Sequence, residues 1–174
     1  VAITIKPVSG YMSEHSIFGS SWSLNGFFLM FYQNAIRFHS CGASIDVSAF
    51  DANGKTVVSC NSTGVVVNGT NYSLAGTGAD DSNPIRLFSV YNEGSYSSKR
   101  GHFLLYSCQI YDNGTLVRDY VPCTNGAGAA GLYDMVNAKF YTNAGSGTFA
   151  VGSNLPSVAR KIKKAYISIG GVAR

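Results

Sequence analysis

Charged residues are scarce in this 174-residue chain: they make up 13% of the sequence, about half the usual share. No window combines a 3.6-residue apolar period with good helix formers, so we expect almost no helix. No apolar run approaches the roughly 20 residues that a transmembrane helix needs. The sequence therefore predicts no membrane insertion and points away from helical folds.

Carboxylate pairs suited to glycoside hydrolysis are also missing. Such an enzyme needs two carboxyl groups flanking the scissile bond. Glu14 and Glu93, the only glutamates, are far apart in the chain, and the neighbouring Asp80 and Asp81 would point to opposite sides of an extended strand. No G-x-S-x-G motif occurs, and no cysteine has an obvious histidine partner. We therefore predict a non-enzymatic protein, with glycoside hydrolase as a disfavoured alternative.

Two other kinds of site lack their surroundings. His15, His39 and His102 have no cysteine or histidine at zinc-ligand spacing. Residues 126–131 spell G-x-G-x-x-G, but aromatic and β-branched residues follow, where a dinucleotide site needs a helix. These features are interpreted as ordinary histidines and a flexible connection between strands.

Short strands joined by tight turns are what the sequence does contain. Apolar runs recur every 8 to 12 residues, with glycine, asparagine and serine between them. This spacing is typical of β-sandwiches and β-barrels, and the length suits one well-buried domain. We predict an all-β fold: a two-sheet antiparallel β-sandwich over residues 1–154.

The stretch FLLYSCQIYDNGTLVRDYV (103–121) is the strongest single prediction. Asn113-Gly114 between two apolar runs indicates a type I′ hairpin, because both turn residues need positive φ. A two-residue loop pairs Asp112 with Thr115, and a regular register then follows outward. In that register Cys108 faces Asp119, Ile110 faces Val117 and Tyr106 faces Val121. One side of the hairpin is expected to form a wall of the core, with Leu104, Tyr106, Cys108, Ile110, Val117 and Val121.

Further hairpins are expected around Gln33-Asn34, Asn53-Gly54 and Asn68-Gly69. The Asn53-Gly54 turn is expected to join strands at 44–50 and 55–60. Residues 85–91 (IRLFSVY) read as one strong strand, and strands are also expected within 132–141 and 148–151.

Four cysteines leave the disulfide question partly open. In the regular register Cys123 lies roughly 13 Å from Cys108, beyond the reach of about 7 Å for a disulfide. A bridge between Cys41 and Cys60 stays possible on the sequence. The favoured interpretation is four buried thiols.

The positive charge is concentrated in one segment. Residues 1–155 carry eight Lys/Arg against nine Asp/Glu, whereas residues 156–174 carry five basic residues and no acid. Val158-Ala159-Arg160 recurs as Val172-Ala173-Arg174, which suggests the start of a 14-residue repeat. We interpret residues 155–174 as a basic β-arm or linker. An assembly arm is favoured over nucleic-acid binding, for which one short basic run is weak evidence.

Two segments carry a resemblance to a known family. YSCQIYDNGTLVRDYVPC (106–123), followed by GLYDMVNAKFYTNAGSGTF (131–149), resembles laminin-G/concanavalin A-like jelly-roll domains of phage and prophage structural proteins. Residues 158–174 are similar to basic repeats that follow such domains in tail proteins, and the likeness is looser over 17–91. The resemblance implies a jelly-roll sandwich in a virion tail or outside the cell, attached to a host-surface glycan.

Candidate ligand-binding residues come from the polar loops and the only tryptophan. A sandwich that binds glycan uses exposed aromatic rings for stacking and polar groups for hydroxyls. We expect these roles for Trp22, Tyr91, Asn92, Glu93 and Tyr96, although Trp22 could equally be a core aromatic. Asp80 and Asp81 are candidate calcium ligands, but a solvated turn is the favoured reading of that loop.

The sequence-based hypothesis is thus a non-enzymatic, tail-associated module that binds host-surface glycan. Its other expected partners are tail proteins or copies of itself, held through the basic arm. The alternative is a purely structural module that decorates or oligomerises the virion and binds no sugar. Calcium is the only cofactor that the sequence suggests.

Overall fold

The computed structural model describes residues 1–8, 14–78, 81–92, 95–96, 101–144 and 148–150, the side chains of 92, 95 and 96 excepted. It divides into two compact units, Val1–Leu105 and Tyr106–Arg174. Regular structure in the described ranges is entirely β, with no helix, as the sequence predicts. Whether residues 1–154 form a single domain, as the sequence predicts, stays a prediction.

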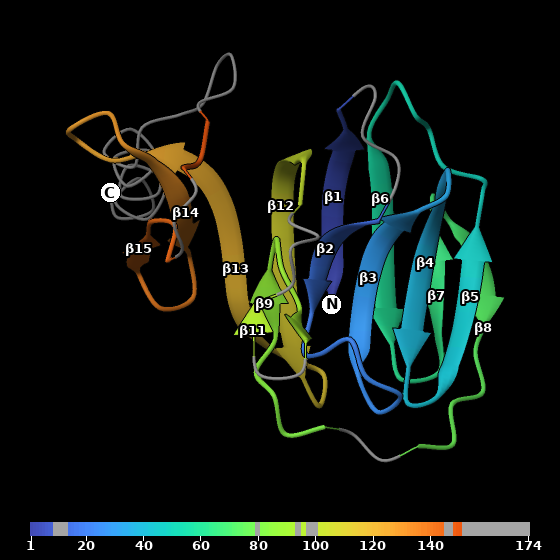
Figure 1. Cartoon of the computed structure of the whole chain (residues 1–174). Coiled ribbons are helices and arrows are strands. Elements are labelled where there is room, and N and C mark those ends of the chain that lie inside the picture. Colours follow the sequence, from blue (N-terminus) through green and yellow to red (C-terminus); the bar gives the residue numbers. More distant parts are fainter. Residues whose placement is uncertain (9–13, 79–80, 93–94, 97–100, 145–147, 151–174) are drawn as a thin grey trace, which may run out of the picture. The chain divides into compact units, whose positions relative to one another are not determined.

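The first unit contains two antiparallel layers (Figure 1). One layer has the neighbouring strands β1 (Ala2–Pro7), β6 (Thr56–Asn61), β7 (Gly64–Val67) and β8 (Thr70–Ser73). The other is a five-stranded sheet in the order β5 (Ala43–Val47), β4 (Ala35–Ser40), β3 (Phe27–Tyr32), β2 (His15–Gly19) and β9 (Arg86–Leu87). A small ribbon pairs β10 (Tyr91–Asn92) with β11 (Ser95–Tyr96). The predicted antiparallel β-sandwich is confirmed.

The core of this unit lies between its two layers. Alternate residues of β1 are buried, as expected for a strand with one face on a core. In the five-stranded sheet, Leu29 pairs with Phe38 and Phe31 with Ile36, and all four side chains are fully buried. Opposite them, the first layer contributes its own fully or almost fully buried aliphatic side chains, Ile3, Ile5, Val58, Val65 and Val67.

The hairpin turns confirm most of the turn predictions. Gln33-Asn34, Asn68-Gly69 and Asn113-Gly114 each have positive φ at both residues, as type I′ turns require. A fourth turn with positive φ at both residues, at Cys41-Gly42 between β4 and β5, was not predicted. The predicted hairpin at Asn53-Gly54 is wrong, because β5 pairs with β4 whereas β6 pairs with β1 and β7.

The expected continuous strand at 85–91 is also wrong. Only Arg86–Leu87 and Tyr91–Asn92 are strands, and Phe88 between them has φ of 64°. A bulky residue in the left-handed region interrupts the extended backbone. Phe88 is held there by a hydrogen bond from its N–H to the Ile17 carbonyl (2.8 Å) and by stacking on Phe103 at 5.0 Å.

The second unit is built on a meander. Strand β12 (Phe103–Asp112) begins in the first unit and continues into the second, where β13 (Thr115–Thr124), β14 (Ala130–Asp134) and β15 (Lys139–Tyr141) follow. Each of these strands pairs antiparallel with the next. The predicted segment 132–141 is therefore a hairpin, whereas residues 148–150 form no strand and Val151 lies outside the described ranges.

A bulge corrects the register expected for the β12–β13 hairpin. Asp112 pairs with Thr115 as predicted, but the register shifts between Ile110 and Tyr111. Ile110 therefore pairs with Arg118, and Cys108 pairs with Tyr120 rather than facing Asp119. The pairing expected between Ile110 and Val117 fails for the same reason, because a bulge places two residues opposite one, whereas the pair expected between Tyr106 and Val121 stays a prediction.

The expected core wall on this hairpin is wrong at the start of β12. Leu104 and Tyr106 are 44% and 38% exposed, although Cys108 on the same side of the strand is fully buried. At the start of β12 it is the opposite side that faces a core, because Phe103 packs on Phe88 and lies 6.3 Å from Phe31, ring centroid to ring centroid. Apolar alternation identified the strand but assigned the buried side of its first residues incorrectly.

All four cysteines are buried thiols outside any disulfide, so the bridge between Cys41 and Cys60 does not form. Burial raises the pKa of the Cys60 thiol to about 12, which keeps it protonated at neutral pH. The favoured interpretation of buried thiols is thereby confirmed.

The predicted basic arm, residues 155–174, lies outside the described ranges. No helix in the described part of the chain is long and apolar enough to cross a membrane.

Candidate functional site

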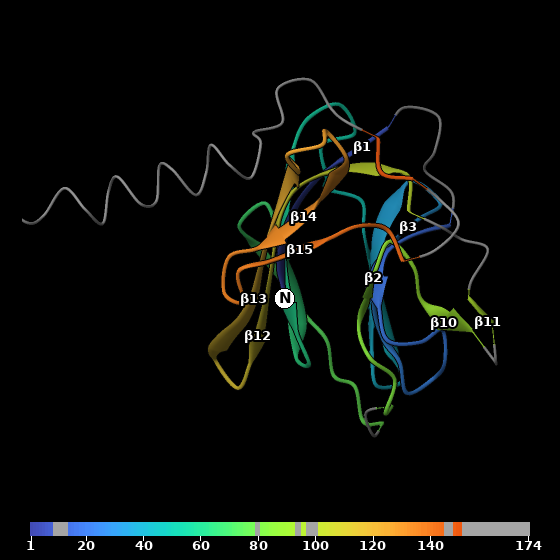
Figure 2. The same cartoon turned by 90° about the vertical axis from the view of Figure 1, so that its left-hand side faces the viewer.

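The face of the five-stranded sheet directed away from the core carries an unusual set of side chains. Pairing across β3, β4 and β5 builds two rungs on this face: Phe28, His39 and Ser44 form one, and Met30, Arg37 and Asp46 the other. We call it the outer face. Viewed edge-on, the β10–β11 ribbon lies on this side of the sheet (Figure 2).

Trp22 and the two rings of the first rung form a stack. The Trp22 indole is parallel to the Phe28 ring, with centroids 5.0 Å apart, and Phe28 in turn is parallel to His39 at 4.7 Å. Phe28 packs with Met30 and Val90 in a buried cluster, against which the half-buried Trp22 and Tyr32 rest. Trp22 is thus neither a fully buried core aromatic nor a fully exposed one.

Hydrogen bonds fix the third ring of the stack. His39 Nε2 lies 3.1 Å from the Leu24 carbonyl oxygen, and Nδ1 lies 2.7 Å from the Ser44 hydroxyl. Because a carbonyl only accepts, the partners assign the proton to Nε2, and the Ser44 hydroxyl donates to Nδ1. His39 therefore holds a set orientation beneath Phe28.

Asp81 ties down the loop that carries Trp22. Its Oδ2 accepts hydrogen bonds from the hydroxyls of Ser20 (3.1 Å) and Ser21, both buried, and its Oδ1 accepts from the Asn83 N–H (3.0 Å). The Asp81 N–H donates to the Asn25 carbonyl at 3.2 Å. This carboxylate therefore organises the loop over residues 20–26.

The backbone brings most of the predicted ligand-binding residues together. The backbone N–H of Trp22 donates to the Tyr91 carbonyl (2.7 Å), and Tyr91 pairs with Tyr96 in the β10–β11 ribbon. Asn92 is the next residue of β10, whereas Glu93 lies outside the described residues, and the side chains of Asn92 and Tyr96 are not described. The Arg86 guanidinium carbon lies 5.4 Å from the centre of the half-buried Tyr91 ring.

The structure brings no metal-binding group together at the described one of the two predicted metal ligands, Asp81. Asp80 lies outside the described residues, and both carboxylate oxygens of Asp81 already accept hydrogen bonds. Within the part of the chain that is described, no three His, Cys, Asp or Glu residues form a group that could hold a metal.

An arginine on the second rung was missed by sequence reasoning. The Arg37 guanidinium carbon lies 3.6 Å from the centre of the Tyr32 ring. Arg37 Nε and Nη2 each donate to one oxygen of Asp46, both at 2.7 Å. The hydrogen bond to Asp46 raises the pKa of Arg37, and partial burial opposes this. The alternating polar residues at 37, 39, 44 and 46 were the available signal, but reading it required the unrecognised Cys41-Gly42 turn.

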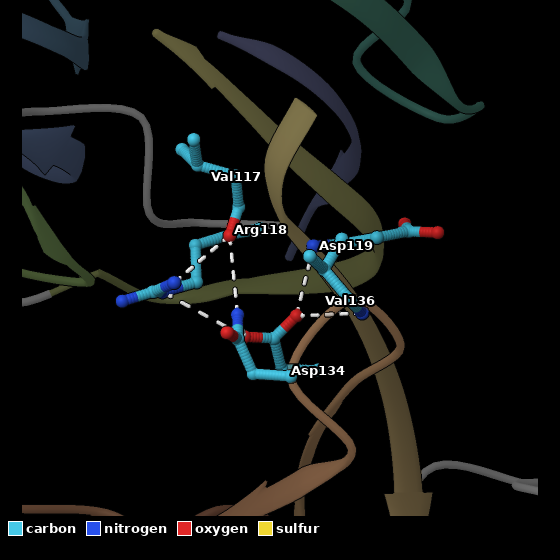
Figure 3. A network of polar contacts seen from close by, with 6 residues as sticks. Val117, Arg118, Asp119, Asp134 and Val136 are labelled. Atoms are coloured by element: carbon cyan, nitrogen blue, oxygen red, sulfur yellow. Dashed lines mark hydrogen bonds and ion pairs between the residues drawn. The ribbon is translucent and has the colours of Figure 1, made fainter. Parts of the chain in front are cut away.

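A separate polar network lies in the second unit (Figure 3). The Asp134 side chain is fully buried, and its Oδ1 accepts from the N–H groups of Asp119 (3.2 Å) and Val136 (3.1 Å). Its Oδ2 accepts from Asn137 Nδ2 (2.7 Å) and lies 3.6 Å from Arg118 Nε. Burial raises the pKa of Asp134, but the hydrogen bonds from Asn137 and from the backbone outweigh it and lower the pKa overall.

This network has the character of a structural joint between β13 and the β14–β15 turn. Figure 3 shows the Asp119 side chain pointing away from the Asp134 carboxylate. A buried carboxylate with three donors around it cannot reach a sugar ring. We therefore assign the Asp134 network to stability.

No protein-family model, curated protein or solved structure matches the chain. The residues of the outer face therefore carry the functional argument.

Replacing Asp81 with alanine is expected to loosen the Trp22 loop. The hydroxyls of Ser20 and Ser21 lose their acceptor, so the free energy of unfolding should fall by about 1–3 kcal/mol. Because Trp22 is the only tryptophan, its emission should shift to longer wavelength as water reaches the indole. Asp51→Ala is the matched control, since Asp51 accepts from the Asn53 N–H in an exposed turn. Unchanged stability and emission in Asp81→Ala would refute this role.

Proposed function

We propose that the chain is a non-catalytic carbohydrate-binding module and that the outer face is its binding surface. The observation that carries the proposal is the Trp22–Phe28–His39 stack, which holds an indole in a fixed orientation on a sheet. Sugar rings offer flat C–H faces that pack on aromatic rings, and hydroxyls that need polar partners. Both kinds of group occur on this face.

The restrained position of Trp22 supports the proposal as much as the residue types on the outer face do. A side chain that is already ordered loses little conformational entropy when a ligand binds. The Trp22 ring stacks on Phe28, and the backbone N–H of Trp22 donates a hydrogen bond to the Tyr91 carbonyl. Asp81 also restrains the loop that carries Trp22. Such a surface is prepared for a ligand before the ligand arrives.

The resemblance noted in the sequence extends the proposal to a biological setting. It favours a phage or prophage tail-associated protein, in a virion or outside the cell, that attaches to a host-surface glycan. Further proposed partners are other tail proteins or copies of the chain, held through residues 155–174, without membrane insertion or nucleic acid. Calcium at Asp80 and Asp81 stays part of the proposal only if binding depends on it.

A structural role in the virion is the second candidate. It is favoured by large apolar side chains in the second unit that remain exposed, with Tyr106 at 38%, Tyr111 at 44%, Met135 at 42% and Val136 at 46%. Exposed apolar groups of this kind can mark surfaces that another protein covers. In this case the outer face would bind no sugar.

A glycan array separates the two candidates. We expect the folded protein to bind a defined set of glycans, and Trp22→Ala to weaken that binding by at least roughly tenfold, which corresponds to about 1.4 kcal/mol. Tyr72→Ala is the matched control, because Tyr72 is a half-buried aromatic residue on β8 in the other layer.

The array should be run with calcium and again with a chelator. Because the Asp81 oxygens already accept hydrogen bonds, we expect the chelator to leave binding unchanged. Loss of binding with the chelator would restore calcium as a cofactor. No binding in either condition, from a folded sample, would favour the structural role.

A further inference from the structure

The second rung of the outer face has a chemistry of its own. Arg37 and Asp46 lie directly opposite each other on β4 and β5 and form a two-point ion pair, while Tyr32 supports the flat face of the guanidinium. The two side chains are 26% and 43% exposed. An ordinary surface ion pair is mobile and contributes little to stability. Here two parallel hydrogen bonds and a stacking contact fix the geometry of both groups.

The pair is a poor site for an anion. A ligand carboxylate would compete with Asp46 for the Nε and Nη2 edge of Arg37, and the Asp46 charge would repel it. The guanidinium and the carboxylate together carry no net charge. A uronic or sialic acid would therefore have to displace Asp46 from the Nε and Nη2 edge of Arg37, or bind elsewhere on the guanidinium next to a carboxylate that repels it.

The same pair is well suited to adjacent hydroxyl groups. Each hydroxyl both donates and accepts, a carboxylate has about four acceptor positions, and a guanidinium has five N–H donors. Only two acceptor positions of Asp46 are used by Arg37. One sugar hydroxyl can donate to Asp46 while its neighbour accepts from Arg37, with both groups already held in place.

We propose that Arg37 and Asp46, supported by Tyr32, form a second contact point that selects uncharged sugars with adjacent hydroxyls. This inference rests on the proposed carbohydrate binding. Phe28 and Met30 belong to successive outward positions of β3, so the two rungs are roughly 7 Å apart along the strand. A ligand that contacts both Trp22 and Arg37 therefore extends from the first rung to the second.

The test compares uncharged oligosaccharides with their uronate- and sialic acid-containing counterparts, for the wild-type protein and two conservative variants. Wild type should bind the uncharged glycans, with little dependence on salt. Arg37→Lys should bind them roughly tenfold more weakly, because lysine cannot form the planar two-point pair. Asp46→Asn should gain binding to the acidic glycans, because the arginine edge is then released. A role limited to stability would not change this preference.

Lys139→Ala is the matched control, since Lys139 Nζ lies 5.0 Å from the Tyr141 ring in the second unit and should not affect glycan binding. Unaltered Trp22 emission confirms that each variant is folded. If the wild-type protein binds no glycan, the proposed function fails and this inference with it. If the wild-type protein binds glycans but prefers acidic ones, or if neither variant changes binding, this inference alone is overturned.

Discussion

Replacing Phe28 with alanine should lower the free energy of unfolding by about 3–5 kcal/mol, the usual cost of removing a buried aromatic ring. Phe28 is 5% exposed and is the middle ring of the stack, so its loss removes contacts with both Trp22 and His39. On β2 the residue opposite Phe28 is Gly19, which has no side chain to fill the space. Urea unfolding followed by Trp22 emission measures the effect.

Phe28→Leu separates packing from ring stacking. Leucine keeps most of the buried volume but cannot stack, so we expect a smaller loss of roughly 1–2 kcal/mol. Both variants should shift Trp22 emission and weaken the proposed glycan binding, because the indole loses the Phe28 ring on which it stacks. A Phe28→Ala protein with wild-type stability and emission would show that the stack does not order Trp22.

Replacing Asp134 with alanine should destabilise the second unit by about 3–5 kcal/mol. The backbone N–H groups of Asp119 and Val136 and the Asn137 amide lose their acceptor in a buried position, and each unsatisfied group costs roughly 1–3 kcal/mol. Asp134→Asn should cost less, since one oxygen remains for the backbone donors. Hydrogen exchange of amides in residues 115–124 and 130–141 measures the local effect, and unaltered exchange in both variants would refute it.

The pH dependence of this contribution follows from the lowered pKa of Asp134. Below its ordinary pKa of about 4, the unfolded chain takes up the proton before the folded protein does, so protonation favours unfolding. The stabilisation is therefore fully present above about pH 4–5 and is lost as the pH falls through the lowered pKa of the folded state. Asp134→Asn, which cannot titrate, should lose less stability than the wild-type protein over this acid range.

Local turn chemistry accounts for what the sequence predicted well. Asparagine followed by glycine tolerates positive φ, so Asn68-Gly69 and Asn113-Gly114 identified their hairpins directly. Cys41-Gly42 makes the same turn without the usual first residue, and Asn53-Gly54 has the usual pair without making a hairpin. A turn motif states what the backbone tolerates, whereas the choice between layers depends on distant partners.

The register of β12 and β13 shows the same limit. The turn fixed the first two pairs, Asp112 with Thr115 and Tyr111 with Leu116, but a single bulge beyond them changed every later pair. Nothing in the alternation of apolar residues marks the bulge. The burial of each face therefore could not be derived from the sequence.

The candidate site was only partly predictable for a related reason. Trp22, Tyr91 and Tyr96 were predicted as candidates from their residue type and their position in or near polar loops, and backbone pairing brings them together. Arg37 and Asp46 are nine positions apart, and only the β4–β5 register places them opposite each other. Asp81 was predicted as a candidate metal ligand, because the sequence does not reveal that its carboxylate accepts hydrogen bonds from serines some sixty positions earlier in the chain.

The most direct test of carbohydrate binding at the outer face is a glycan titration followed by Trp22 emission, using an uncharged glycan that binds in the array. Because Trp22 is the only tryptophan, any saturable change in emission reports on this face. We predict a saturable change in the wild-type protein, with the same midpoint as binding measured by calorimetry. Calorimetric binding that leaves Trp22 emission unchanged, and that persists in Trp22→Ala, would contradict the account and place the sugar elsewhere on the protein.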